Sequence, residues 1–183
     1  ECRDGGFGNL TWPTLLATAD DGLAEITRTS TTFTGSRFGV TWSGIRAGSP
    51  GPWKARFATV DLWGNIDVAG HDILPDVYGI GEAHASWAPE VEQFGFAMIA
   101  MEDVTQGMLN FADPSGWVLI DPGVALASGP VSNVFIGSGP GGYGVAWVAG
   151  SGTQQVWFGE YSHEMDPVQI HNLSGDSPIL INW

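Results

Sequence analysis

Cysteine, basic residues and long apolar runs are scarce in this sequence of 183 residues, and each scarcity excludes a class of protein. The single cysteine, Cys2, cannot form an intrachain disulfide, so no disulfide framework holds the domain together. The chain has 6 Lys and Arg against 20 Asp and Glu, a net charge of −14. This charge argues against a nucleic-acid or anionic-membrane partner, because both require a basic face. No apolar run approaches the roughly 20 residues of a transmembrane helix.

Glycine and tryptophan are abundant instead, with 27 and 9 residues. Glycine at this level disfavours helices, because it loses more backbone entropy on folding than other residues do. The hydrophobic fraction of 43% argues against intrinsic disorder, which requires a low hydrophobic content. A chain of this length forms one domain or at most two small ones. The composition therefore predicts one Gly- and Trp-rich domain with little helix.

One sequence element recurs along the chain. It consists of a turn of small residues, an aromatic anchor, a glycine, and alternating apolar residues that end near a tryptophan. Its copies are Gly5–Trp12, Gly35–Trp42, Glu92–Met98 and Gly141–Trp147, with the anchors Phe7, Phe38, Phe94 and Tyr143. The copy at Glu92–Met98 departs most, because it lacks the tryptophan. Apolar residues that alternate with period two indicate β-strands.

Two further elements accompany the anchors. An aromatic or apolar strand follows each anchor and ends, in three of four copies, in a turn with glycine; the copies are Leu15–Gly22, Ala55–Gly64, Met108–Gly116 and Val156–Ser162. Short runs typical of half-buried strands precede the later anchors at Ser30–Thr34, His84–Trp87 and Ser132–Ile136. The first anchor has no such run before it. The residues Ser177–Trp183 match this run and have no anchor after them.

The mismatch at the two ends predicts how the chain closes. If the C-terminal strand precedes the first anchor, the chain holds four four-stranded units of about 46 residues, a typical repeat length. We therefore expect an all-β fold, a small β-propeller of about four four-stranded blades, closed by pairing of the C-terminal strand with the N-terminal blade. The expected blades are 178–183 plus 1–29, 30–80, 81–129 and 130–177. Closure removes exposed sheet edges. The alternatives are a piece of a longer array and a ring completed by a second chain.

The repeated motifs resemble those of a known family. The motifs Gly-x-Tyr/Phe-Gly-Val-x-Trp and aromatic-Ala-x-x-Asp-x-x-Gly are similar to the tandem β-propeller repeats common in secreted and surface proteins of bacteria. The resemblance covers nearly the whole chain in four copies. It implies a non-catalytic binding or scaffolding module that is extracellular, on the cell surface or periplasmic. It says almost nothing about chemistry.

No residue pattern favours a catalytic site or a bound cofactor. The segment Gly137–Gly142 lacks the lysine and following helix of a phosphate-binding loop, so we expect a hairpin or a loop between blades there. His71 and His171 occupy matching places in their units, but no closely spaced histidines support a metal site. Acidic pairs such as Asp20-Asp21 suit turns. No Asp-x-Asp-x-Asp-Gly loop is present, and Ca²⁺ binding by isolated loop carboxylates remains an open alternative.

The tryptophans divide into structural and candidate ligand-binding residues. Five recur in the repeat frame and are expected to pack between blades or across strands: Trp12, Trp42, Trp87, Trp147 and Trp183. Trp53 follows a loop rich in Gly and Pro, and Trp63 lies in a tight turn before Gly64. These two residues are the candidate ligand contacts, because a flat aromatic face stacks well on a sugar ring.

The favoured function is a non-catalytic binding or scaffolding module with a protein or glycan partner, contacted through loops such as Ala47–Trp53 and Gly137–Gly142. A lectin-like propeller is one alternative, and it predicts exposed aromatic residues beside polar side chains, repeated between blades. A glycoside hydrolase or lyase predicts converging carboxylates, roughly 5–10 Å apart, at the mouth of the channel. A subunit of a larger assembly predicts a contiguous exposed apolar patch, with Cys2 as a candidate intermolecular link.

Overall fold

A computed structural model describes residues 23–46, 53–73, 79–101, 105–117, 124–126, 130–164 and 167–173. The strands in these ranges are β1 (Leu23–Phe33), β2 (Arg37–Arg46), β3 (Trp53–Asp61), β4 (Ile66–Asp72), β5 (Ile80–Ala88), β6 (Gln93–Met101), β7 (Thr105–Ala112), β8 (Val124–Ala125), β9 (Val131–Gly139), β10 (Gly142–Ala149), β11 (Gln155–Ser162) and β12 (Pro167–Asn172). None of these residues is helical, so no membrane-spanning helix occurs among them.

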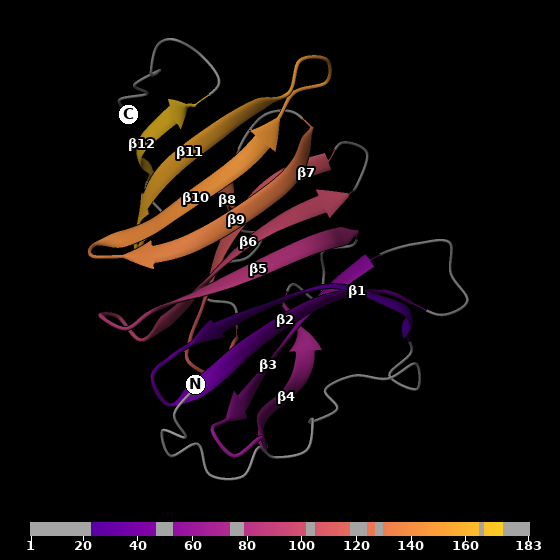
Figure 1. Ribbon diagram of the computed structural model, residues 1–183, viewed down its shortest axis with the longest axis vertical. Coiled ribbons are helices and arrows are strands. Elements are labelled where there is room, and N and C mark those ends of the chain that lie inside the picture. The colour runs from indigo at the N-terminus through magenta and orange to yellow at the C-terminus, as the bar shows by residue number, and fades with distance from the viewer. Residues whose placement is uncertain are drawn as a thin grey trace, which may run out of the picture.

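The strands form three sheets, each an antiparallel meander of four strands (Figure 1). The first sheet contains β1 to β4, the second β5 to β8 and the third β9 to β12, each in sequence order. The all-β prediction is therefore confirmed for the described part of the chain. The pair Gly139↔Gly142 closes the β9–β10 hairpin, so the segment Gly137–Gly142 forms the hairpin expected for it.

The repeat elements coincide with these strands. The three described anchor copies lie in β2, β6 and β10, the elements after them in β3, β7 and β11, and the elements before them in β1, β5 and β9. The expected boundary at residues 29 and 30 falls inside β1, which pairs with β2 from Leu23 to Phe33. Register shifts at Ala24 and Arg28 interrupt the alternation of β1, which is why the sequence pattern indicated a strand only from residue 30.

The fourth expected unit is not among the described residues. Its anchor copy, residues 5–12, and the expected ring-closing strand, residues 178–183, both lie outside them. Ring closure is therefore a proposal and not a feature of the described residues.

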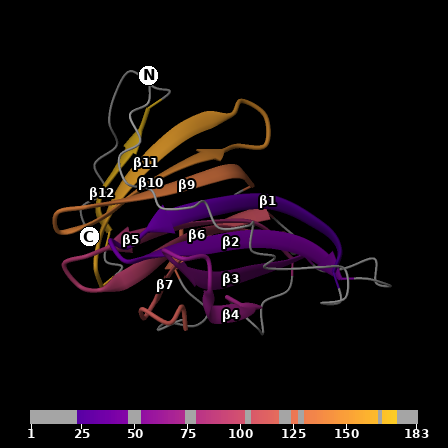
Figure 2. The same cartoon turned by 60° about the horizontal axis from the view of Figure 1, so that its bottom comes forward.

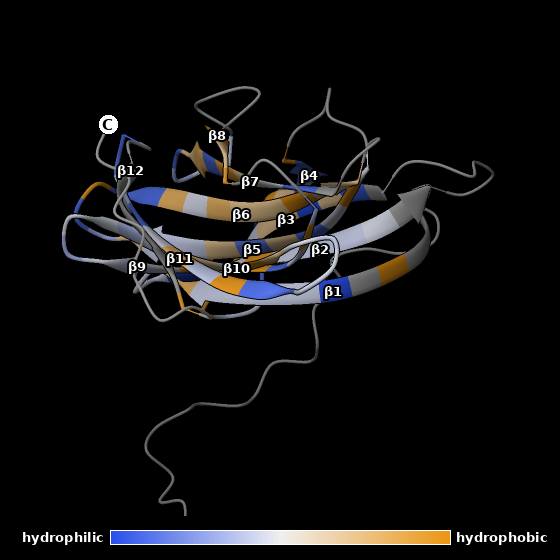
Figure 3. Ribbon diagram, turned by 90° about the horizontal axis from the view of Figure 1, so that it is seen from above, coloured by the Kyte–Doolittle hydropathy of each residue, from blue (hydrophilic) through white to orange (hydrophobic). Residues whose placement is uncertain are grey.

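The three sheets pack face to face. The strand β5 contacts β1, β2 and β3 of the first sheet, and β9 contacts β5, β6 and β7 of the second. The first strands β1, β5 and β9 lie together in the middle of the molecule, whereas β4 and β12 lie at its periphery (Figures 1 and 2). This order places the second sheet between the other two. Both faces of β6 are consequently buried, and the strand is coloured as hydrophobic over much of its length in Figure 3.

Aromatic rings fill the interface between the first two sheets. The centroid of the Phe57 ring lies 4.8 Å from that of Phe94 and 5.1 Å from that of Phe96, and all three side chains are fully buried. The interface between the second and third sheets buries Leu109 and Tyr143. Edge-to-face aromatic pairs at such distances add about 0.5–1.5 kcal/mol beyond the burial of their area.

The glycine that follows each anchor makes the close approach of the sheets feasible. An anchor and its glycine point to opposite faces of their strand. A Cβ atom on Gly39 would lie 2.8 Å from Cε1 of Phe94, the anchor of the second sheet. A Cβ atom on Gly95 would lie 2.5 Å from Cε1 of Tyr143, the anchor of the third sheet. The first and second sheets therefore each receive the anchor ring of the next sheet on their own anchor glycine.

The described tryptophans of the repeat frame have the structural role expected of them. Trp42 and Trp147 are buried, with 2% of each residue exposed. Trp87 is half-buried and packs on the Phe94 ring at a centroid distance of 4.6 Å. Trp12 and Trp183 lie outside the described residues.

Candidate functional site

The turn between β3 and β4 is built around the carboxylate of Asp61. Its Oδ1 atom accepts hydrogen bonds from the backbone N–H groups of Trp63 and Asn65, both at 2.8 Å, and its Oδ2 atom accepts one from the side-chain amide of Asn65. The amide hydrogen bond from Asn65 is the main reason that the pKa of Asp61 is lowered. Gly64 has φ 86° and supplies the left-handed conformation that the turn requires.

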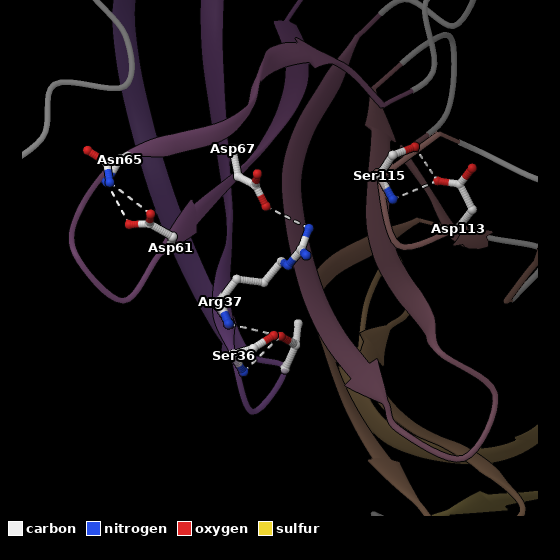
Figure 4. Close-up of polar contacts among 8 residues, drawn as sticks. Ser36, Arg37, Asp61, Asn65, Asp67, Asp113 and Ser115 are labelled. Atoms are coloured by element: carbon white, nitrogen blue, oxygen red, sulfur yellow. Dashed lines mark hydrogen bonds and ion pairs between the residues drawn. The ribbon is translucent and has the colours of Figure 1, made fainter.

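The turn after β7 repeats the backbone hydrogen bonds of this arrangement (Figure 4). The side-chain donor differs, because the hydroxyl group of Ser115 donates to Oδ1 of Asp113 at 2.6 Å. The Oδ1 atom of Asp113 accepts hydrogen bonds from the backbone N–H groups of Ser115, at 2.9 Å, and Trp117, at 3.1 Å. The N–H of Asp113 donates to the carbonyl of Trp117, and Gly116 has φ 83°. Two adjacent sheets thus carry the same five-residue Asp-x-x-Gly-x turn at the same position in the meander.

Each turn exposes one tryptophan. Trp63, the third residue of the first turn, is 71% exposed. Trp117, the fifth residue of the second turn, is 59% exposed. The sequence predicted the exposure of Trp63 but did not single out Trp117, although the Asp-x-x-Gly motif before it was visible.

The Trp117 ring is held in place by the first sheet. It stacks on the ring of His71, which belongs to β4, at a centroid distance of 4.7 Å and an interplanar angle of 24°. The Nε2–H group of His71 donates a hydrogen bond to the carbonyl of Gly116 at 3.0 Å. A side chain on Gly116 would overlap the Phe57 ring, so glycine is required there for close packing as well as for backbone conformation. One face of the indole is therefore supported by His71.

For the other residues that the sequence analysis considered as site residues, the structure describes the backbone at most. Trp53 begins β3, but its side chain lies outside the described residues, as does the loop 47–52 before it. His171 pairs with Phe158 through β12, and its side chain is likewise not described. No cluster of three or more His, Cys, Asp or Glu side chains suited to a metal ion occurs among the described residues. Cys2 falls outside those ranges.

A second polar cluster lies on the first strands of the three sheets, and the sequence patterns did not indicate it. The carboxylate of Glu82 on β5 forms an ion pair with Nη1 of Arg28 on β1 and accepts a hydrogen bond from Nε2 of His84 at 2.9 Å. The His84 ring packs on Phe135 of β9 at a centroid distance of 4.8 Å. Arg28 sits at a bulge with φ 45°, an uncommon conformation for a residue with a side chain.

The charges of this cluster stabilise the contact between the first and second sheets. The Glu82 side chain is 5% exposed, and both of its oxygens have partners. Burial, and secondarily the positive charge of Arg28, lower the pKa of His84, which keeps its ring neutral near pH 7. A carboxylate that is bonded on both oxygens is poorly placed to act as an acid or a nucleophile.

Comparison of the sequence with known protein families and with curated proteins gives no match.

Proposed function

We propose that this chain is a non-catalytic binding module of the secreted or surface-associated kind, which holds a glycan on Trp63 and Trp117. The observation that carries this proposal is that two adjacent sheets repeat one turn, and that each copy exposes a tryptophan, at its third residue in the first turn and at its fifth in the second. Indole combines a flat apolar face with an N–H donor, which suits the C–H face and hydroxyl groups of a sugar. A glycan is itself a repeating molecule and is well matched to repeated aromatic platforms.

The order of the two turns and of the Trp117 ring supports binding rather than mere exposure. The Asp61 and Asp113 carboxylates hold the two turns, and His71 supports the Trp117 ring. A side chain that is already ordered loses little conformational entropy when a ligand docks, so more of the contact energy appears as affinity.

The architecture proposed for the module is a closed β-propeller. Three successive four-stranded meanders that pack face to face, with their first strands together in the middle, support this arrangement. In it, residues 178–183 form the first strand of the fourth sheet and residues 5–12 the second. Hydrogen exchange tests this closure: the amides of residues 179–181 should be as protected as those of β6 at every protein concentration. Exchange at the rate of an unfolded peptide would refute closure, and protection that rises with concentration would indicate pairing between chains.

The glycan proposal is tested by screening the purified protein on a glycan array, with and without calcium, and by titrating the strongest hit. We expect Trp63→Ala and Trp117→Ala each to weaken binding about tenfold, which corresponds to about 1.4 kcal/mol. Truncating the exposed Trp63 should change the free energy of unfolding by no more than about 0.5 kcal/mol. A calcium requirement would implicate loop carboxylates in the site.

Leu173→Ala is the matched control. Leu173 follows β12 of the third sheet and is 62% exposed, so its truncation removes exposed apolar surface outside both turns. This variant should bind like the wild type. The glycan proposal is refuted if no glycan on the array binds, or if the variant lacking both tryptophans keeps wild-type affinity. In either case a scaffolding role with a protein partner becomes the better account.

A further inference from the structure

The sheets contact one another in one repeated way: the anchor ring of one sheet lies on the anchor glycine of the sheet before it. At the two ends of the stack this contact is missing among the described residues. Phe94 of the second sheet lies on Gly39 of the first, and Tyr143 of the third sheet lies on Gly95 of the second. By the same rule Gly144, which follows Tyr143, should receive the anchor ring of a further sheet. Among the described residues no anchor occupies that position.

An apolar groove marks the position. It lies on the face of the third sheet that is turned away from the second sheet, has a volume of about 450 Å³, and is lined by residues that include Phe135, Gly137, Gly144, Ala146 and Phe158. A Cβ atom on Gly144 would lie 3.0 Å from the Phe158 ring. Phe158 on β11 is the counterpart of Phe57 on β3, which lies equally close to the Cβ position of Gly39. The pocket beside Gly144 is therefore built like the pocket that Phe94 fills.

At the opposite end of the stack, the first sheet has an anchor ring with no described glycine to lie on. Phe38 is the anchor of the first sheet and has the same place in its strand as Phe94 and Tyr143. Phe94 and Tyr143 are buried, with 0% and 2% of each residue exposed, whereas Phe38 is 41% exposed. It has no described glycine of a preceding sheet beneath it.

We infer that the N-terminal segment of the same chain fills both gaps: the Phe7 ring lies on Gly144, and the Phe38 ring lies on Gly8. The segment carries the only anchor copy outside the described residues, an aromatic residue followed by glycine. Phe7 lies sixteen residues before Leu23, and sixteen extended residues reach up to about 50 Å, whereas two spacings between packed sheets amount to only about 20 Å. A single chain can therefore span from β1 to the third sheet. The inference rests on the propeller proposed above and assigns the contacts that close it.

The direct test is nuclear Overhauser spectroscopy on the full chain with labelled phenylalanine rings. We expect cross-peaks from the Phe7 ring to the Hα protons of Gly144 and the methyl group of Ala146. In a mixture of two differently labelled chains these cross-peaks should stay within one chain. Cross-peaks found only between chains would assign the groove to a second copy and overturn the inference. A Phe7 ring with no contact to the third sheet would overturn it as well.

A substitution series provides the second readout. Phe7→Ala should accelerate amide exchange in β10 and β11 at least tenfold, and Phe7→Leu should restore part of the protection because it refills the pocket. Leu173→Ala is the control, since Leu173 is 62% exposed and is not an anchor. Equal effects of Phe7→Ala and Leu173→Ala would refute the assignment. Protection of residues 179–181 from exchange tests the propeller, and glycan binding tests the proposed function. A failure of either proposal can therefore be distinguished from a failure of the Phe7 assignment.

Discussion

Arg28→Gln should destabilise the fold more than Glu82→Gln, although both changes break the same ion pair. The Glu82 side chain is 5% exposed, whereas that of Arg28 is 55% exposed. Arg28→Gln therefore leaves a buried carboxylate whose remaining partner is the neutral ring of His84. Glu82→Gln instead leaves a guanidinium group that water can reach and a buried amide oxygen that still accepts from His84.

The magnitudes follow from this asymmetry. Removing one partner of a fully buried ion pair costs about 3–5 kcal/mol, but Arg28 is 55% exposed, so water screens part of this interaction. Because His84 also keeps its hydrogen bond to Glu82, we expect Arg28→Gln to cost about 2 kcal/mol. Glu82→Gln should cost about 1 kcal/mol, the net value of one hydrogen bond. The double variant should resemble Glu82→Gln alone, since it leaves no buried charge, and the coupling energy is then about 2 kcal/mol.

Urea unfolding at pH 7, followed by circular dichroism, measures these differences, provided that the denaturant dependence is equal among the variants. Arg37→Gln serves as the control for loss of a charge, because Arg37 and its partner Asp67 are both well exposed, and it should cost less than about 1 kcal/mol. Equal costs for Arg28→Gln and Glu82→Gln, or the reverse order, would refute the argument that a buried carboxylate dominates this contact.

Three further predictions concern packing and pH. Phe57→Ala should cost about 3–5 kcal/mol in urea unfolding, because the ring is fully buried between two sheets; a cost under 2 kcal/mol would mean that the interface collapses to fill the cavity. Gly116→Ala should lower the melting temperature more than Gly141→Ala does, since both glycines have positive φ but only the former would overlap Phe57; equal shifts would contradict this packing. Burial raises the pKa of Tyr161 to about 12 and also raises that of Tyr143. In the unfolded chain their phenols ionise near pH 10, whereas in the folded protein they ionise at a higher pH. The folded state therefore keeps its full free energy of unfolding below about pH 10, and the contribution of these tyrosines is lost as the pH rises through 12. Urea unfolding across that range, compared with Tyr161→Phe, checks the direction, and a stability that rises with pH would be the contrary result.

The strands and their turns were predictable because they depend on local patterns. Alternation of apolar residues located β2, β6 and β10, and the Asp-x-x-Gly motifs located the turns at Asp61 and Asp113. The exposure of Trp63 also followed from its place in a tight turn. Each of these features is decided within a few residues by pleat geometry and by the conformational freedom of glycine.

The bulges and the polar contacts between sheets were not predictable from these patterns. The register shift at Arg28 hides the first half of β1, because an extra residue breaks the period of two. The partner of Arg28 lies 54 residues further along the chain, and nothing near Glu82 marks that acid as buried. His84 was likewise visible only as one of four histidines.

By itself the sequence determined an all-β chain of repeated strands, the recurrence of an aromatic residue with a glycine, and the turn that exposes Trp63. Only the tertiary structure decided that Phe94 and Tyr143 each rest on the anchor glycine of the preceding sheet, that His71 supports Trp117, and that Glu82 ties two sheets together. The physical reason is the range of the interactions. Strand and turn preferences act between neighbours in the chain, whereas burial and pairing depend on which faces of distant sheets come into contact.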